Sequence, residues 1–245
     1  MKMTRTRLTF AAAALLLACQ AHAATIEPVF DTFGTLPGTE FDGDGIPNDA
    51  VAITGVTSGS DTITLGLTAH QRFSNPPLTN DGAGTFTATA GTNDGTPGNP
   101  GTTSTWNFAF YVGIAGGGTL ADYQFTLVYD FDPGTDTDDS VMGSWDLTAT
   151  AVARGFGTSP LLETSQNPTF GFLATDAAGF IVAPGTVPFD PNASGEYSFA
   201  LVVSTLGGGE LGRAAINVNV VPEPAALALL GLGLVGAGLA RRRRR

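Results

Sequence analysis

The sequence predicts an all-β fold, a single antiparallel β-sandwich of jelly-roll or immunoglobulin-like type with about nine strands. Three observations predict it. Apolar residues recur at every second position in several segments, as in strands that turn one face to a core. Clusters of Gly, Asn, Asp and Pro separate these segments at roughly ten-residue intervals. Between the two ends of the chain, no segment sustains the 3.6-residue apolar period of a helix.

The alternation is clearest in Thr62–Thr68, where Ile63, Leu65 and Leu67 share one face. Periodicity alone does not reveal the order of the strands in space. The expected strands are Val51–Val56, Thr62–Thr68, Thr85–Ala90, Trp106–Ile114, Tyr123–Tyr129, Trp145–Ala149, Phe170–Ala174, Tyr197–Val203 and Ile216–Val220.

Two similar turn signals flank one of these strands. Thr79–Gly82 and Thr92–Gly95 both read Thr-Asn-Asp-Gly and bracket Thr85–Ala90. Asn and Asp bond to their own backbone and Gly adopts positive φ freely, so we expect tight turns at both places.

The N-terminal end has the order of a secretory signal peptide. Met1–Arg7 carries three basic residues, Leu8–Ala18 is apolar, and Ala21-His22-Ala23 is a small-x-small cleavage site. We expect residues 1–23 to form a signal helix that signal peptidase removes after Ala23.

Cys19 is the only cysteine in the chain. It would leave with the signal peptide, so the mature domain can form neither a disulfide nor a cysteine-based zinc site. Leu16–Cys19 offers an alternative, because it is similar to a lipobox that would make Cys19 a lipidated N-terminus. Leucine directly before Ala18 fits that pattern poorly.

The C-terminal end combines three signals. Val221–Pro224 reads Val-Pro-Glu-Pro, Ala225–Ala240 is uncharged, and a block of arginines follows that would stop translocation on the cytoplasmic side. The expected stop-transfer residues are Arg241, Arg242, Arg243, Arg244 and Arg245. At 1.5 Å per residue, an apolar helix of this length reaches about 24 Å, which makes it a marginal span of a roughly 30 Å hydrocarbon core. A short anchor suits a segment that is cut off.

Residues 221–245 resemble the PEP-CTERM sorting signal of Gram-negative bacteria. The resemblance implies that an exosortase-type enzyme recognises Val221, Pro222, Glu223 and Pro224 and removes the tail after export. It also implies a surface or extracellular location, membrane contact only through the precursor's tail, and association with exopolysaccharide and biofilm. A permanent C-terminal anchor is the alternative.

Removing both ends leaves one domain, residues 24–220, which is strongly acidic. Ala24–Val221 holds three arginines, no lysine and 21 acidic residues, a net charge of −18. Such a domain repels nucleic acid and anionic lipid and attracts divalent cations or basic partners.

Glu40–Asp49 is similar to the aspartate-rich calcium loops of thrombospondin type 3 repeats, with oxygen-bearing side chains at alternate positions and Gly45 at the sixth. The alternative, a solvated Asp/Gly turn, is favoured because such a match arises easily in an acidic chain. The candidate calcium ligands are Glu40, Asp42, Asp44, Ile46 through its carbonyl, Asn48 and Asp49. Asp130–Asp139 is a second acidic loop, interpreted as an exposed hairpin loop because it lacks a glycine at the sixth position.

Catalytic residues are not predicted, and the chain is not expected to be an enzyme. His70 is the only histidine after maturation, and the sequence contains neither a Gly-x-Ser-x-Gly elbow nor His-Glu-x-x-His. Core packing is the favoured role for four aromatic residues that would otherwise form a sugar-stacking platform: Trp106, Tyr111, Tyr123 and Trp145.

The sequence therefore favours an exported, non-enzymatic surface or matrix protein. A calcium-dependent, lectin-like carbohydrate-binding module is the first alternative. A secreted hydrolase that uses paired carboxylates is the second.

Overall fold

The computed structural model describes residues 26–222 except 73–75, 94, 96–100 and 136. The predicted signal helix and C-terminal helix, residues 1–23 and 225–240, lie outside the described residues.

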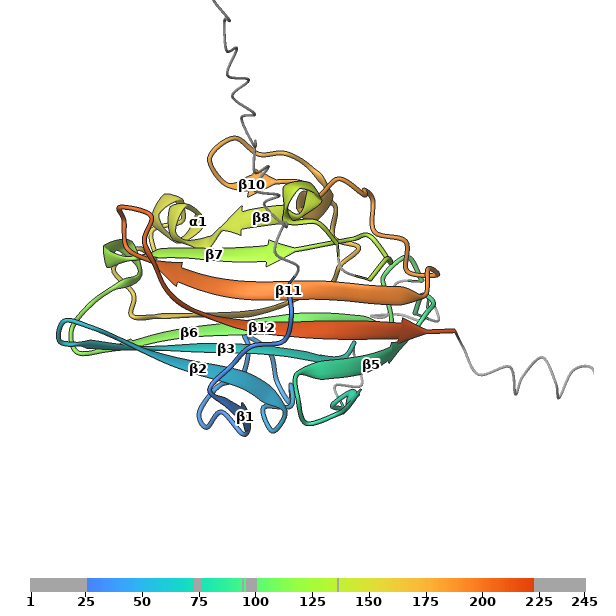
Figure 1. Ribbon diagram of the computed structural model, residues 1–245, viewed down its shortest axis with the longest axis horizontal. Helices are drawn as coiled ribbons and strands as arrows, with labels where there is room; N and C mark the ends of the chain where they lie inside the picture. The colour runs from blue at the N-terminus through green and yellow to red at the C-terminus, as the bar shows by residue number, and fades with distance from the viewer. Residues whose placement is uncertain (1–25, 73–75, 94, 96–100, 136, 223–245) are drawn as a thin grey trace, which may run out of the picture.

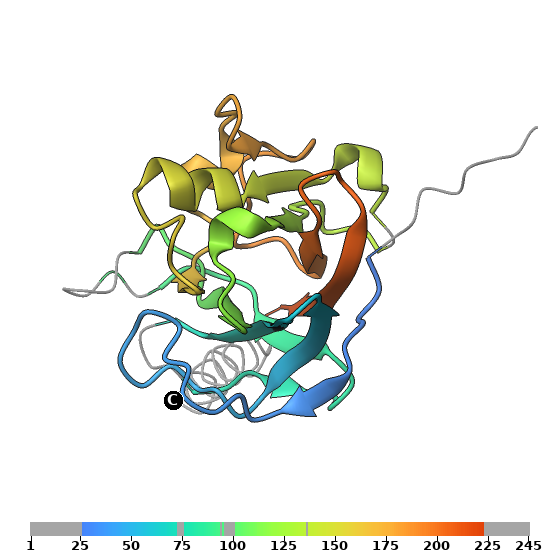
Figure 2. The same ribbon diagram turned by 90° about the vertical axis from the view of Figure 1, so that its left-hand side faces the viewer.

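The described residues form two β-sheets packed face to face (Figures 1 and 2). The five-stranded sheet has the order β1 (Thr32–Gly34), β2 (Val51–Ser58), β3 (Asp61–Gln71), β6 (Trp106–Ala115) and β9 (Leu161–Gln166). The seven-stranded sheet has the order β10 (Ile181–Val182), β8 (Gly143–Asp146), β7 (Gln124–Tyr129), β11 (Gly195–Ser204), β12 (Glu210–Val221), β5 (Thr85–Thr89) and β4 (Thr79–Asn80).

Among the described residues, helical structure is confined to short segments between strands. The α-helix α1 (Leu147–Ala153) follows β8 directly and lies beside β7 and β8 (Figure 1). The 3-10 turns among the described residues are η1 (Leu120–Asp122), η2 (Asp139–Val141) and η3 (Gly171–Ala174).

The core lies between the sheets and is built by the alternating residues. Ile63, Leu65 and Leu67 on β3 are fully buried, as the alternation predicts. Phe108 on β6 meets Phe199 on β11, with ring centroids 4.7 Å apart, so the two sheets are joined through aromatic contacts. The all-β sandwich is confirmed.

One pair of strands is parallel, which corrects the expectation of a purely antiparallel sandwich. β5 pairs with β12 in parallel, from Thr85 beside Asn217 to Thr89 beside Val221. β5 thereby extends the seven-stranded sheet beyond the hairpin that β11 and β12 form. The other strand pairs given by the ladders of the described residues are antiparallel.

The described residues hold twelve strands instead of about nine. Three of the added strands, β1, β4 and β10, have only two or three residues, too few for a visible alternation. The fourth, β9, reads Leu-Leu-Glu-Thr-Ser-Gln at the edge of its sheet, and its residues are half-buried or exposed. Because β9 is largely polar, its sequence shows no apolar alternation that would predict a strand.

One predicted strand is correct only in its first two residues, which belong to β8, and another is wrong. Trp145–Ala149 ends as a strand at Asp146, because the Asp146 side chain accepts a hydrogen bond from the Ala149 N–H at 2.7 Å and caps α1. The residues that follow, Leu-Thr-Ala-Thr-Ala-Val-Ala, complete that helix. Phe170–Ala174 contains the 3-10 turn η3 instead of a strand.

The first predicted tight turn is confirmed. The Asn80 side chain accepts from the Gly82 N–H at 3.1 Å, and Asp81 accepts from Ala83 and Thr85 at 2.7 and 3.0 Å. These bonds to backbone N–H groups lower the pKa of Asp81. At the second turn, Asp94 lies outside the described residues.

Candidate functional site

The structure separates the four aromatic residues named from the sequence. Trp106 and Tyr123 are buried in the core, which confirms the favoured interpretation for these two. Tyr111 packs on the outer face of the five-stranded sheet with Ile46. Trp145 is half-buried and lines a surface groove, so the four residues do not form one platform.

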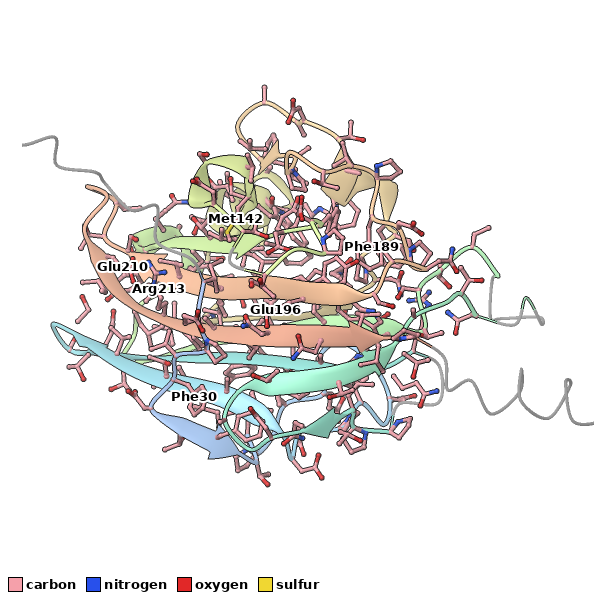
Figure 3. The ribbon with its side chains drawn as sticks, turned by 45° about the vertical axis from the view of Figure 1, so that its right-hand side comes forward. Phe30, Met142, Phe189, Glu196, Glu210 and Arg213 are labelled. Carbon is pink, nitrogen blue, oxygen red and sulfur yellow. The ribbon has the colours of Figure 1, made fainter. Side chains whose placement is uncertain are left out.

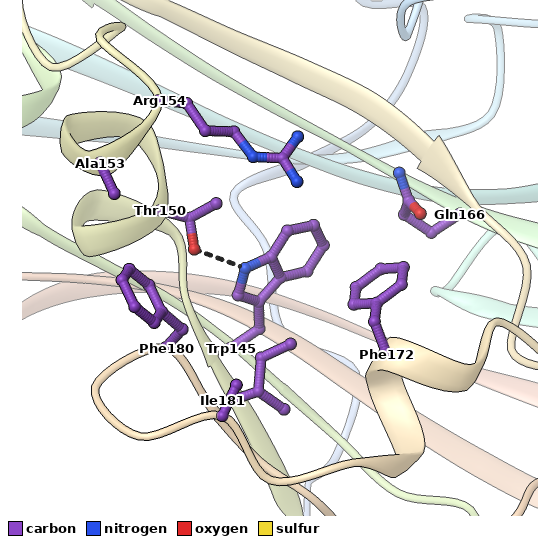
Figure 4. Close-up of a pocket in the computed structure, with 9 residues that line it drawn as sticks. Trp145, Thr150, Ala153, Arg154, Gln166, Phe172, Phe180 and Ile181 are labelled. Atoms are coloured by element: carbon purple, nitrogen blue, oxygen red, sulfur yellow. Dashed lines mark hydrogen bonds between the residues drawn. The ribbon is translucent and has the colours of Figure 1, made fainter.

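Trp145 is held rigidly at the junction of β8 and α1. Its indole N–H donates to the Thr150 hydroxyl at 2.9 Å, one helical turn further on (Figure 4). The rings of Phe110 and Phe172 meet the indole edge-on, with centroids 5.9 and 5.2 Å away. The plane of the indole is therefore fixed before any ligand arrives.

Two adjoining hollows form the groove around this indole. The first has a volume of about 410 Å³ and the second about 400 Å³, each within the range of small-ligand sites. The residues that line both hollows are Trp145, Thr150, Arg154 and Gln166. The first is completed by Ala153, Phe172, Ala177, Phe180 and Ile181. The second is completed by Asp42, Phe110, Leu147, Ala151, Phe156, Leu161, Leu162, Glu163 and Thr164.

Exposed phenylalanines gather in this groove. Within the part of the chain that the structure describes, the exposed phenylalanines are Phe156, Phe172 and Phe180, with 57%, 40% and 39% of their surface accessible. All three line one of the two hollows. A soluble domain leaves few aromatic rings in water, so their gathering marks this groove as a candidate binding site.

Polar groups in the groove come from α1 and β9. Arg154 is the C-cap residue of α1, and its side chain extends over the indole of Trp145 toward Gln166 (Figure 4). The Gln166 amide donates to Thr164 at 2.8 Å, which orients its oxygen. The groove thus combines rigid rings with planar hydrogen-bonding groups.

The predicted calcium loop packs against β9 through Glu163. One carboxylate oxygen of Glu163 accepts from the N–H groups of Glu40 and Phe41, at 3.1 and 3.0 Å, and from the Thr39 hydroxyl. This anchor holds Phe41 fully buried although its φ is 49°. Sequence reasoning missed Glu163, because it lies 122 residues beyond Phe41.

Two of the candidate calcium ligands, Asn48 and Ile46, make other contacts. The Asn48 side chain donates to the Thr39 carbonyl at 3.3 Å, and Ile46 packs beside Phe41. Gly45 has a positive φ, 71°. Among the described residues, no three His, Cys, Asp or Glu side chains gather as they would around a metal ion. Calcium binding at Glu40, Asp42, Asp44, Ile46, Asn48 and Asp49 stays a prediction.

The second acidic loop begins with a buried carboxylate, so this part of the exposed-loop expectation is corrected. Asp130 is 1% exposed and accepts from the Ser198 N–H at 3.3 Å, while its other oxygen has no hydrogen-bond partner. Burial raises the pKa of Asp130 to about 7. The next acids, Asp132 and Asp138, accept from nearby backbone N–H groups at the surface.

His70 lies near the end of β3 and is buried. Its ring nitrogens are 3.0 Å from the Gln71 carbonyl and 2.8 Å from the Ser165 hydroxyl. Burial lowers the pKa of His70, so the ring is neutral near pH 7. Asn107 also donates to Ser165 at 2.8 Å, and a ring only 1% exposed is shielded from a substrate. These contacts support a structural role.

The sorting motif begins within β12. Val221 is the last residue of β12, and its carbonyl accepts from the Ala90 N–H at 2.8 Å. Pro222 is the last residue that the structure describes. None of the helices in the described part of the chain has the length and apolarity needed to cross a membrane.

The remaining predicted sites at the two ends of the chain lie outside the described residues. At the N-terminal end these are Cys19 and the cleavage residues Ala21 and Ala23. At the C-terminal end they are Glu223 and Pro224 of the sorting motif and the stop-transfer residues Arg241, Arg242, Arg243, Arg244 and Arg245. Signal cleavage and the stop-transfer role of these arginines stay predictions.

Comparison with characterised proteins and with solved structures finds no match. A family model described as the PEP-CTERM protein-sorting motif matches residues 220–245. This motif implies processing by an exosortase-type enzyme and export to the cell envelope or surface. The chain is a PEP-CTERM sorting-domain-containing protein.

Proposed function

We propose that the sandwich is a non-enzymatic surface or matrix protein that binds exopolysaccharide in the groove around Trp145. In this proposal the C-terminal signal delivers the domain to the outside of the cell, and the groove then holds it in the biofilm matrix. Exopolysaccharide is the proposed partner, and the biofilm matrix outside the cell envelope is the proposed location.

The observation that carries it is the gathering of the exposed phenylalanines around a fixed indole. A sugar ring has an apolar face of C–H groups and a rim of hydroxyl groups. Trp145 and Phe172 offer flat apolar surfaces to the first, while Gln166 and Arg154 offer hydrogen bonds to the second. Two adjoining hollows suit consecutive sugars of a chain better than one small molecule.

The groove supports binding more strongly than hydrolysis. Asp42 and Glu163 both line the second hollow, as the carboxylate pair of a glycosidase would. However, one oxygen of Glu163 already accepts three hydrogen bonds from residues 39–41, which keeps this carboxylate in a structural role. A group held in this way is poorly suited to act as a nucleophile or proton donor.

The test is binding of the secreted protein to exopolysaccharide purified from its host. We expect Trp145→Ala and Phe172→Ala each to weaken binding about tenfold, because each removes a stacking surface. Leu206→Ala is the control, since Leu206 is 67% exposed and does not line either hollow.

Equal binding by wild type and both groove variants would refute the proposal. Release of reducing ends from the bound polysaccharide would instead indicate a hydrolase, particularly if Asp42→Asn abolished the release.

A further inference from the structure

We propose that the first hollow binds the carboxylate group of an acidic sugar through Arg154, and the second hollow binds a neutral sugar linked to it. This inference rests on the proposed function, since it names the class of saccharide that the same groove takes.

The three arginines of the described residues have different surroundings. Arg213 forms a two-pronged ion pair with Glu210, with both distances 2.6 Å (Figure 3). Arg72 donates to Asn107 at 3.3 Å and lies over the Phe170 ring, 5.2 Å from its centroid. Only Arg154 has a guanidinium group without a hydrogen bond or ion pair to another described residue.

An unpaired arginine is unexpected in a domain with 21 acidic residues. A guanidinium carries five donors in one plane and pairs with a carboxylate through two parallel hydrogen bonds. Two acids near Arg154 already accept backbone hydrogen bonds. No ion pair joins Arg154 to Asp42 or Glu163, which line the second hollow with it. Asp146 caps α1 through Ala149, and Asp176 accepts from the Ala183 N–H at 2.8 Å. The guanidinium therefore remains available to a ligand.

The two hollows differ in charge, and this difference orients the ligand. The lining of the first hollow contains Arg154 and no acidic residue. The lining of the second contains Asp42 and Glu163 as well as Arg154. A sugar carboxylate is favoured in the first hollow and repelled in the second, where Asp42 is suited to accept hydrogen bonds from neutral hydroxyl groups.

The charge of the whole domain limits how acidic the polymer can be. A net charge of −18 repels a chain that carries a carboxylate on every sugar. One arginine compensates one carboxylate. The favoured ligand is therefore a glycan in which uronic acid residues are separated by neutral sugars.

The test compares two disaccharides by calorimetry with the secreted protein. One is glucuronic acid linked to glucose, and the other is the same molecule with its carboxyl group reduced to the alcohol. We expect the acidic disaccharide to bind about tenfold more tightly or better, and Arg154→Gln to remove this preference. Arg154→Lys should restore only part of it, because lysine keeps the charge but not the planar pair of donors.

Arg213→Gln is the matched control, since it removes an equal charge outside the groove. The preference for the acidic disaccharide should survive it. A preference that survives Arg154→Gln, or tighter binding of a sulfated disaccharide or an acidic peptide, would overturn the uronic acid assignment.

The two proposals fail in different ways. Equal binding of both disaccharides, lost in Trp145→Ala, would overturn the role of Arg154 and leave the glycan-binding proposal standing. Failure of both disaccharides and of host exopolysaccharide to bind would overturn both proposals.

Discussion

The indole N–H of Trp145 donates to the Thr150 hydroxyl at 2.9 Å, and that hydroxyl donates in turn to the Asp146 carbonyl at 2.7 Å. The half-buried ring is thereby connected to the first turn of α1. A binding surface that is already ordered loses less conformational entropy when a ligand arrives.

Thr150→Val should loosen this ring without filling or emptying space. The variant removes both hydrogen bonds of the hydroxyl, so we expect a loss of stability of about 1 kcal/mol and weaker glycan binding. Urea unfolding and calorimetry measure the two effects. Thr175→Val is the control, because Thr175 also bonds to the carbonyl four residues before it but does not touch the indole. Equal loss of binding in both variants would contradict a specific role for Thr150.

Glu163→Ala should release the loop that carries Phe41. Three donors of residues 39–41 lose their common acceptor, and Phe41 loses support for a backbone conformation that non-glycine residues rarely adopt. We expect a loss of stability on the order of 3 kcal/mol in urea unfolding. Glu27→Ala removes a comparable charge from an exposed position and should change stability little. Similar values for both variants would show that Glu163 does not anchor the loop.

Asp130→Asn should change how stability depends on pH. The pKa of Asp130 is about 7 in the folded protein, because burial disfavours the carboxylate, while the unfolded chain has the ordinary value near 3.8. Between these two values the folded state binds the extra proton, so stability falls as pH rises through this window. The asparagine variant lacks this contribution. It should gain stability relative to wild type on going from pH 4 to pH 8, by an amount on the order of 3 kcal/mol.

Thermal unfolding at several pH values measures this difference. Glu27→Gln removes one charge from the surface and controls for reduced repulsion in an acidic domain. Parallel pH profiles for wild type and Asp130→Asn would contradict the effect of burial.

Calcium and magnesium should raise the melting temperature to similar extents. A net charge of −18 is screened by either ion, whereas the described structure does not bring three acidic side chains of residues 40–49 together. Melts in calcium, magnesium and EDTA make the comparison. A larger shift with calcium that disappears in the double variant Asp42→Asn, Asp44→Asn would establish the calcium loop instead.

The strands that could be predicted from the sequence are the ones that bury alternate residues. β3 and β11 follow this rule, with a fully buried face in each. β9 does not, because its sheet edge and polar residues remove the contrast between its faces. At Trp145–Ala149 the apolar alternation was present, but the Asp146 cap and the residues after it favoured a helix.

The groove could not be predicted from the sequence because its residues come from separate elements. Trp145 lies in β8, Gln166 ends β9 and Phe172 belongs to η3. Each residue is ordinary in its own segment, and only the packing of β8 and α1 beside β9 brings them together. Arg154 was visible as one of three arginines in the mature domain, but its lack of a partner among the described residues is a property of the fold.

Processing should preserve the whole of β12. The Val221 carbonyl accepts from Ala90, and Val221 pairs with Thr89, so a cut before Val221 would remove contacts of the folded sheet. We expect mass spectrometry of the secreted protein to find an N-terminus at Ala24 and a C-terminus at or after Val221 and no later than Pro224. Glu223→Ala should block processing and leave Arg245 on a membrane-bound precursor, whereas Glu27→Ala should be processed normally. An intact Arg245 on the wild-type protein would establish a permanent anchor, and a lipid-modified Cys19 would establish a lipoprotein.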